Sequence, residues 1–136
     1  FISPEELRIP QYVKDETLTP LHQNYKETAD LEAELPGLDV LYMTRIQKER
    51  FFNEEDYLRL KGCYELDEKL LQQAPPTMPV LHPLPRIDEI KPDVDNDPRA
   101  AYFDQVHNGV YIRMAIILAL LGIPDPLTGK KVLESI

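Results

Sequence analysis

Short apolar runs alternate with polar segments along the chain, and prolines mark many of the boundaries. Residues 39–43 and 79–81 each fit a short strand that is buried on both faces. Candidate helix starts lie at Ser3-Pro4, Asp30, Asn53, Asp67 and Asp97-Pro98. Strands that alternate with helices predict an α/β domain with three αβα layers around a mostly parallel sheet.

The longest apolar stretch lies near the end of the chain. Residues 110–121 are apolar or small at every position except Arg113. The stretch is shorter than the roughly 20 residues that span a bilayer, and a helix that is apolar on all sides has to be buried on all sides. We therefore expect a domain at residues 1–122 that ends in a long apolar helix, followed by a tail at residues 123–136.

Composition and charge narrow the classes of partner. The chain has 136 residues, of which 43% are hydrophobic, and this suits one compact domain. The formal net charge is −9, which argues against nucleic acid and anionic membrane as partners. The only cysteine, Cys63, allows no intrachain disulfide, so a reducing, cytoplasmic location is expected.

Metal and cofactor motifs are missing from the sequence. His22 and His107 have no partners at metal-ligand spacing. There is also no glycine-rich phosphate loop and no Gly-x-Ser-x-Gly elbow. The sequence therefore predicts neither a metal site nor a cofactor.

A polar loop follows the first predicted strand. Arg45, Gln47 and Glu49 are two residues apart, so their side chains point the same way if the loop is extended. A guanidinium and an amide that converge on one spot suit a carboxylate ligand, and Glu49 could hold Arg45 in place. On spacing alone, however, a solvated charged loop is the better explanation.

A second loop, His82-Pro83-Leu84-Pro85-Arg86, follows the second predicted strand. Its two prolines stiffen the chain and leave the carbonyl groups of Pro83 and Leu84 available to a ligand amine. The sequence also allows a cis bond before Pro85. A rigid turn without a ligand explains the prolines equally well. A lone histidine such as His82 is more often a satisfied core residue than a catalyst or a ligand.

Both loops resemble segments of the aspartate carbamoyltransferases. Residues 39–51 are similar to the aspartate-site segment of that family, and residues 82–90 are similar to its proline loop. Residues 93–95, 97–103 and 108–113 continue the match in the same order. The resemblance runs from the first residue to about Gly122. An ornithine-type enzyme half fits less well, because that family has a cysteine in its His-x-Leu-Pro loop.

The resemblance implies the aspartate-binding part of an enzyme of pyrimidine synthesis. That enzyme transfers the carbamoyl group of carbamoyl phosphate to the amine of L-aspartate, giving N-carbamoyl-L-aspartate and phosphate. Arg45 and Gln47 would grip the side-chain carboxylate of aspartate. The carbonyl groups of Pro83 and Leu84 would contact the reacting amines. Supporting or loop-closing roles would fall to Glu49, Arg50, Tyr57, His82, Pro85, Arg86 and Asp88.

Within that set, Tyr57 and Asp88 match the family's loop-closure pair, and Arg50 matches a residue that reaches the other domain. The family's carbamoyl phosphate motifs, Ser-x-Arg-Thr and His-Pro-x-Gln, do not occur in this sequence. Carbamoyl phosphate is therefore expected to bind only through a separate amino-terminal domain, and the chain, which looks like a piece of a longer one, is expected to be inactive alone. A non-catalytic binding module that keeps the fold is the alternative.

The resemblance also implies a homotrimeric parent protein. That parent could be a free enzyme, a part of a larger pyrimidine-synthesis polypeptide, or a catalytic chain bound to regulatory subunits.

Overall fold

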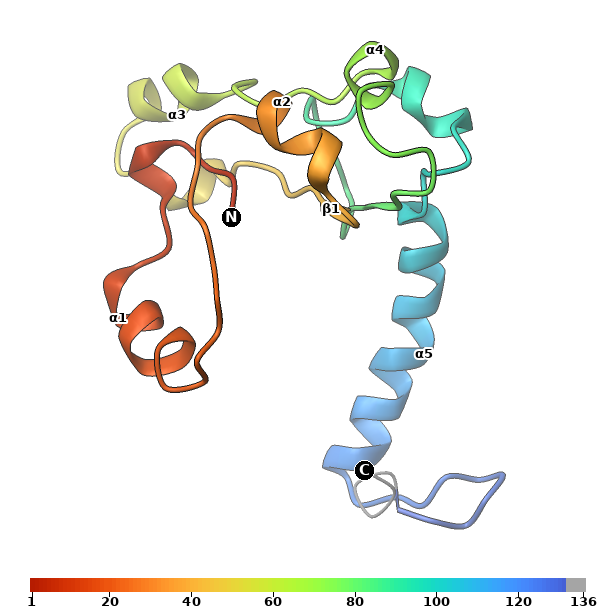
Figure 1. Ribbon diagram of the computed structural model, residues 1–136. Coiled ribbons are helices and arrows are strands. Elements are labelled where there is room, and N and C mark those ends of the chain that lie inside the picture. Colours follow the sequence, from red (N-terminus) through yellow and green to blue (C-terminus); the bar gives the residue numbers. More distant parts are fainter. Residues whose placement is uncertain (132–136) are drawn as a thin grey trace.

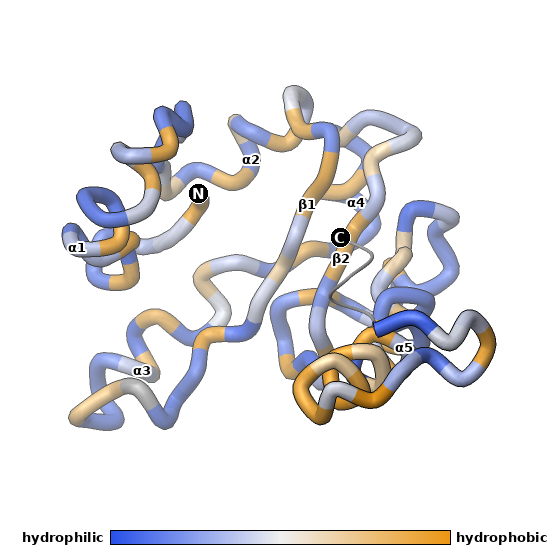
Figure 2. Tube along the Cα trace, turned by 90° about the horizontal axis from the view of Figure 1, so that it is seen from below, coloured by the Kyte–Doolittle hydropathy of each residue, from blue (hydrophilic) through white to orange (hydrophobic). Residues whose placement is uncertain are grey.

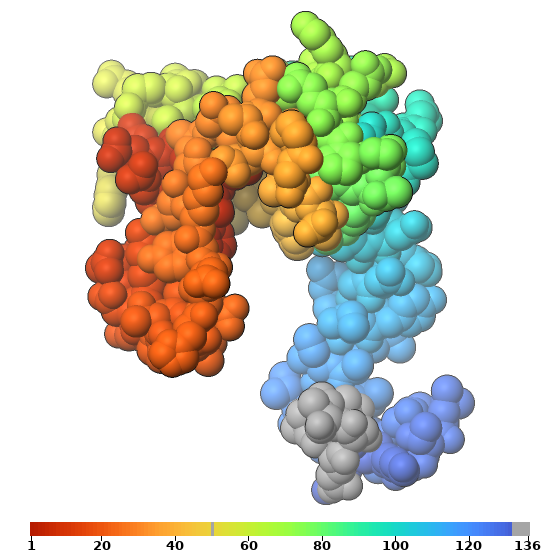
Figure 3. All heavy atoms as spheres, in the orientation of Figure 1, coloured from red at the N-terminus to blue at the C-terminus, as the bar shows by residue number. Residues whose placement is uncertain are grey.

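The computed structural model describes residues 1–131, except for the side chain at position 50. An upper body carries two arms that extend in the same direction (Figure 1). One arm holds α1 (Gln11–Val13), and the other is the helix α5 (Tyr102–Leu120). The space-filling view shows an open space between the two arms (Figure 3).

A small parallel sheet lies at the centre of the body. β1 (Leu41–Tyr42) pairs with β2 (Val80–Leu81) in parallel, with Leu41 opposite Val80. Isolated parallel bridges join Ile2 to Thr28, Leu66 to Ile90 and Val80 to Ala100. The parallel arrangement agrees with the α/β prediction. The prediction that residues 39–43 are buried on both faces is wrong, because Tyr42 is 55% exposed while Leu41 and Met43 are buried.

Three short helices begin where the sequence predicts. α2 (Leu31–Glu34), α3 (Glu54–Leu60) and α4 (Glu68–Leu71) follow Asp30, Asn53 and Asp67, respectively. Each of these cap side chains accepts a hydrogen bond from a backbone N–H three residues further on. The side-chain oxygens thus satisfy backbone donors that the first helical turn leaves without partners.

Short helical segments of other types connect the strands and helices. Four are tight 3₁₀ turns: η1 (Glu5–Leu7), η3 (Leu35–Gly37), η4 (Lys48–Arg50) and η5 (Pro92–Asn96). The segment η2 (Lys14–Leu18), which follows α1, is a wider π-helical turn. The predicted helix start at Ser3 is only the short turn η1, and no side chain caps it. The predicted start at Asp97 is also wrong, because the Asp97 carboxylate binds Arg99 and helix α5 begins at Tyr102.

The core lies between the sheet, α2, α4 and the first turn of α5. Its buried members are Leu31, Leu35, Leu41, Met43, Leu66, Leu71, Ala74, Met78, Val80, Ile90, Val94 and Tyr102. These residues are spread along the chain from Leu31 to Tyr102. The core therefore fixes the two strand ends from which both candidate loops leave.

α5 extends away from this core after its first turns. The tube coloured by hydropathy shows that apolar residues cover much of the helix (Figure 2). Ile112, Ile117 and Leu120 are more than half exposed. Among the residues that the structure describes, no helix has the length and apolar character needed to cross a membrane. α5 therefore presents an uncovered apolar surface in this chain.

The helix α5 ends at a glycine in the left-handed region. Gly122 has φ 63°, and the N–H of Ile123 donates to the carbonyl of Leu118 at 2.9 Å. Glycine adopts this conformation without the steric cost of a Cβ atom. The first part of the predicted tail folds back as a loop, with an antiparallel bridge between Pro124 and Lys131. Residues 132–136 of that tail lie outside the described residues.

Candidate functional site

The two candidate loops leave neighbouring strands at the same edge of the sheet. β1 leads into the loop at residues 43–50, and β2 leads into the proline loop at residues 82–90. Because the strands are parallel, both carboxyl ends face the same side. Ligands of open α/β sheets bind at this edge.

Arg45 is held by an ion pair within its own loop. Its Nη2 lies 2.6 Å from Oε1 of Glu49, and its Nη1 lies 3.4 Å from Oε2. This is the contact with Glu49 that the residue spacing predicts. The hydrogen bonds that Arg45 donates to Glu49 raise the pKa of Arg45 above its ordinary value, so the guanidinium stays charged. A ligand carboxylate would share this cation with Glu49.

Arg45 and Gln47 line one cavity of about 350 Å³, which we call the outer pocket. This volume is within the range of small-molecule sites. The other lining residues are Ile2, Ser3, Pro4, Leu7, Thr44, Ile46, Phe51 and Tyr64. The structure thus brings the two predicted carboxylate-binding residues to one pocket, beside the first residues of the chain.

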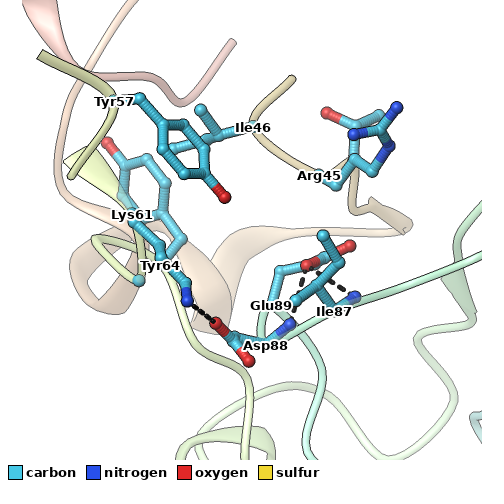
Figure 4. Close-up of a pocket in the computed structure, with 10 residues that line it drawn as sticks. Arg45, Ile46, Tyr57, Lys61, Tyr64, Ile87, Asp88 and Glu89 are labelled. Carbon is cyan, nitrogen blue, oxygen red and sulfur yellow. Dashed lines mark hydrogen bonds and ion pairs between the residues drawn. The ribbon is translucent and has the colours of Figure 1, made fainter. Parts of the chain in front are cut away.

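A second cavity, the inner pocket, is also lined by Arg45 (Figure 4). Its volume is about 40 Å³, enough for a few water molecules only. It is lined by residues of the loop after β1, of α3 and the turn that follows it, and by residues 87–89 of the proline loop. The two candidate loops therefore meet here rather than in the outer pocket.

Tyr57 and Asp88 both line the inner pocket. The carboxylate of Asp88 pairs with Nζ of Lys61 at 3.4 Å (Figure 4). Lys61 was not among the residues that the sequence indicated. Lys61 directly follows α3, and its N–H donates to the carbonyl of Tyr57 at 2.8 Å, so its position four residues after Tyr57 is the signal that could have indicated it.

The proline loop turns sharply after Pro83. The bond between Leu84 and Pro85 is cis, and Leu84 has φ 45°. Among residues 1–131, no hydrogen bond reaches the carbonyl oxygens of Pro83 and Leu84. Pro83 lines a separate cavity of about 560 Å³ on the α5 side, and Leu84 packs against the core. The structure does not bring these two residues into one pocket with Arg45 and Gln47.

Arg86 anchors the loop to the base of α5. Its Nη2 lies 2.6 Å from Oδ2 of Asp95, and its Nη1 lies 3.3 Å from the hydroxyl of Tyr102. The Tyr102 hydroxyl donates to Oδ1 of Asp95 at 2.6 Å. Hydrogen bonding with Arg86 holds the pKa of Asp95 below its usual value. Burial, helped by the hydrogen bond to Asp95, raises the pKa of Tyr102 to about 12.

His82 is buried, and its ring is satisfied on both sides. Nε2 lies 2.8 Å from Oε1 of Glu89, and Nδ1 accepts the backbone N–H of Leu84 at 2.8 Å. This agrees with the interpretation of His82 as a satisfied core residue. The Oε1 atom of Gln105 accepts the backbone N–H of His82 at 2.8 Å. Glu89 and Gln105 were not among the residues that the sequence indicated. The spacing of seven residues between His82 and Glu89, at the two ends of the loop, could have indicated the first contact.

Two further sequence predictions concern this region. The role of Arg50 depends on a side chain that lies outside the described part of the structure. Among the described residues, no group of three or more histidine, cysteine, aspartate or glutamate side chains could hold a metal ion.

Comparison with known proteins places the chain in a family. A family model described as "Aspartate/ornithine carbamoyltransferase, Asp/Orn binding domain" matches residues 1–120. The chain belongs to this family. The assignment agrees with the resemblance found at the two loops.

Catalytic subunits of aspartate carbamoyltransferase are among its curated relatives. The subunit from Bifidobacterium longum subsp. infantis is 57% identical over 134 residues, which is 98% of this chain and 41% of the relative. The subunit from Lachnoclostridium phytofermentans is also 57% identical, over 90% of this chain and 40% of the relative. The chain thus spans about two fifths of the length of these relatives.

Solved carbamoyltransferase structures share the fold. The catalytic subunit of M. jannaschii aspartate transcarbamoylase superposes with a TM-score of 0.74 at 40% identity, over 89% of this chain and 39% of that one. The Trypanosoma cruzi enzyme in complex with carbamoyl phosphate and aspartate gives a TM-score of 0.75 at 36% identity, over 85% and 39%. The α/β carbamoyltransferase fold of this chain is therefore shown by both sequence and structure.

Proposed function

We propose that this chain is the aspartate-binding part of an aspartate carbamoyltransferase. The observation that carries the proposal is the outer pocket, where Arg45 and Gln47 lie together in a chain that is 57% identical to catalytic subunits of that enzyme. In the reaction, the amine nitrogen of L-aspartate bonds to the carbonyl carbon of carbamoyl phosphate. The bond from that carbon to the phosphate oxygen breaks, and the amine loses a proton. The products are N-carbamoyl-L-aspartate and phosphate.

Each loop has its own task in this proposal. Arg45 and Gln47 bind the side-chain carboxylate of aspartate, because a guanidinium and an amide offer several donors to one anion. Glu49 orients Arg45 through their ion pair. The carbonyl groups of Pro83 and Leu84 accept hydrogen bonds from the reacting amines. Catalysis is mainly orientation and electrostatic stabilisation of the tetrahedral transition state.

Closing the site requires the two loops to move relative to each other. Pro83 and Leu84 do not share a pocket with Arg45, and Asp88 pairs with Lys61. We assign loop closure to a contact between Tyr57 and Asp88, which already line the inner pocket. His82, Pro85 and Arg86 keep the proline loop rigid during this movement. Arg50 reaches the other domain.

The complete enzyme supplies what this chain lacks. Carbamoyl phosphate binds through an amino-terminal domain, and the 136-residue chain alone is inactive. Residues 1–122 form the aspartate domain, with a three-layer αβα arrangement closed by the long apolar helix, and residues 123–136 form its tail. The parent is a cytoplasmic homotrimer, either free, joined to a larger pyrimidine-synthesis polypeptide, or bound to regulatory subunits.

A carbamoyl-transfer assay tests the proposal. The chain is mixed with the amino-terminal half of the Bifidobacterium longum relative, and N-carbamoyl-L-aspartate is measured. Activity should appear only in the mixture and should fall by at least about 100-fold with Arg45→Ala, because the ligand carboxylate loses its charged hydrogen-bond donor. Arg8→Ala is the matched control, since Arg8 lies in an exposed ion pair with Glu5.

Two outcomes would contradict the proposal. An inactive mixture that sedimentation shows to be assembled would favour a non-catalytic binding module with the same fold. Activity that survives Arg45→Ala as well as it survives Arg8→Ala would remove Arg45 from the aspartate site.

A further inference from the structure

His82 and Glu89 form a buried contact across the base of the proline loop. Oε1 of Glu89 accepts from Nε2 of His82 at 2.8 Å. Its other oxygen, Oε2, accepts the backbone N–H groups of Ile87 and Asp88 at 3.2 and 3.1 Å (Figure 4). One carboxylate therefore ties the start of the loop to its end.

The same contacts determine which ring nitrogen of His82 carries the proton. Nδ1 accepts the N–H of Leu84, so it must present a lone pair and carry no proton. The ring proton then lies on Nε2 and is donated to Glu89. Because the partner of one nitrogen sets the state of the other, Glu89 fixes the tautomer that Leu84 requires.

Leu84 needs this support because its backbone lies in the left-handed region. Its φ is 45°, and in this region the Cβ atom of a non-glycine residue crowds the backbone, so the conformation is strained. The hydrogen bond from the Leu84 N–H to His82 stabilises that conformation. The direction of the Pro83 and Leu84 carbonyl groups follows from the backbone angles on either side of them.

We propose that Glu89 and His82 are a positioning pair for the carbonyl groups of the proline loop. The pair touches no substrate and acts through the backbone of Leu84. This inference rests on the proposed carbamoyl transfer for its effect on rate. The tautomer of His82 and the protection of the Leu84 N–H can be measured without any activity.

Glu89→Gln is the sharpest variant, because it keeps the shape of the side chain. If the amide oxygen faces His82, the amide N–H₂ group meets the donors of Ile87 and Asp88. If the oxygen faces those donors, the N–H₂ group faces Nε2 and forces the ring proton onto Nδ1, where it meets the Leu84 N–H. The first orientation loses the hydrogen bonds from Ile87 and Asp88, and the second loses the hydrogen bond from Leu84 to His82.

The first experiment measures kcat and KM for aspartate in the assembled mixture. Glu89→Gln should lower kcat about 10- to 100-fold, the effect of misplacing a reacting group by a fraction of an ångström to one ångström. KM for aspartate should change less than threefold, since Arg45 and Gln47 keep their pocket. Glu65→Gln is the matched control, because Glu65 forms an exposed pair with Lys91 and should leave both constants unchanged.

The second experiment uses the wild-type chain and needs no variant to fold. Nitrogen NMR of the His82 ring should show an unprotonated Nδ1 and a protonated Nε2 at neutral pH. Amide exchange should show a protected Leu84 N–H that exchanges faster in Glu89→Gln. A protonated Nδ1 in the wild type would overturn the proposal, as would an unchanged kcat in an active Glu89→Gln mixture. An inactive wild-type mixture with the expected tautomer would instead count against the proposed function and leave the pair supported.

Discussion

Gln105 and His82 are joined across 23 residues of chain, with the Gln105 side-chain carbonyl accepting the backbone N–H of His82 at 2.8 Å. The amide nitrogen of Gln105 donates to the hydroxyl of Tyr42 at 3.1 Å. A single side chain on α5 thus contacts the ends of both β1 and β2. These are the points from which the two candidate loops leave the sheet.

Replacing Gln105 by leucine should destabilise the chain. Gln105→Leu keeps the size of the side chain but leaves the His82 N–H without its acceptor. The free energy of unfolding should fall by about 1–2 kcal/mol, the cost of one partly buried unsatisfied donor. Urea denaturation followed by circular dichroism measures the change. Gln72→Leu, at an exposed position after α4, is the control, and an equal loss in both variants would contradict the role of this contact.

The tyrosine at the base of α5 should make the chain less stable in alkali. The pKa of Tyr102 is raised to about 12 by burial and by Asp95, above the unfolded value of about 10. The fold therefore favours the protonated phenol. The resulting stabilisation is complete below about pH 10 and is lost as the pH rises towards 12.

Unfolding by urea at about pH 9 and about pH 11 tests the predicted loss of stability in alkali. Wild type should lose more stability between the two values than Tyr102→Phe does. Tyr111→Phe should behave like wild type, because the Tyr111 side chain is mostly exposed. A Tyr102→Phe variant with the wild-type pH dependence would contradict the assignment.

The ion pair between Asp97 and Arg99 should make the chain sensitive to acid. Hydrogen bonds from Arg99 hold the pKa of Asp97 below its usual value. A depressed carboxylate pKa contributes stability above the unfolded value of about 3.9, and this contribution is lost as the pH falls through the folded pKa. Arg99 also donates to the carbonyl of Leu71 at 2.9 Å, so the pair connects α4 to the segment before α5.

Asp97→Asn should lower the free energy of unfolding by about 1–3 kcal/mol at neutral pH. It should also reduce the loss of stability between about pH 5 and pH 2. Urea titrations across this range provide the measurement. Asp39→Asn, at an exposed position before β1, should leave both quantities unchanged. A steeper acid loss in Asp97→Asn than in wild type would refute the stabilising role of the Asp97 carboxylate.

The uncovered apolar surface of α5 should make the isolated chain self-associate. Ile117→Lys places a charge at the middle of this surface, where the wild-type side chain is 56% exposed. Burying an isoleucine contributes about 1.5–3 kcal/mol, so the dissociation constant should rise by at least about tenfold. Sedimentation equilibrium at several concentrations measures it.

Leu58→Lys on α3 makes the same change of charge at a side chain that is 59% exposed. It should leave self-association unaltered. A chain that is monomeric at all concentrations, or one in which both variants dissociate alike, would argue against α5 as the contact surface.

Local signals in the sequence predicted local structure well. Asp30, Asn53 and Asp67 cap their helices because a cap needs only a short polar side chain and the N–H groups that follow it. The ion pair between Arg45 and Glu49 likewise lies within one loop. In each case, all the groups involved are close together in sequence.

Predictions that depended on distant contacts were less complete. Asp97 and Pro98 have the pattern of a helix start, but Arg99 takes the Asp97 carboxylate and donates to carbonyl groups near α4. Burial of only one face of β1 could not be inferred from its apolar residues, because that depends on what packs against Tyr42. The roles of Glu89 and Gln105 were missed for the same reason, since each acts on His82 from another segment.

Tyr102 and Gln105 both lie at the end of α5 that is attached to the body. Tyr102 holds Arg86 of the proline loop, and Gln105 holds the ends of the two strands. A movement of the helix would therefore be transmitted to the proline loop through these two residues. Thermodynamic linkage makes such a coupling reciprocal. Suppose that a partner bound to the far end of α5 changes the affinity of the loops for a ligand. The ligand must then change the affinity of α5 for that partner by the same factor.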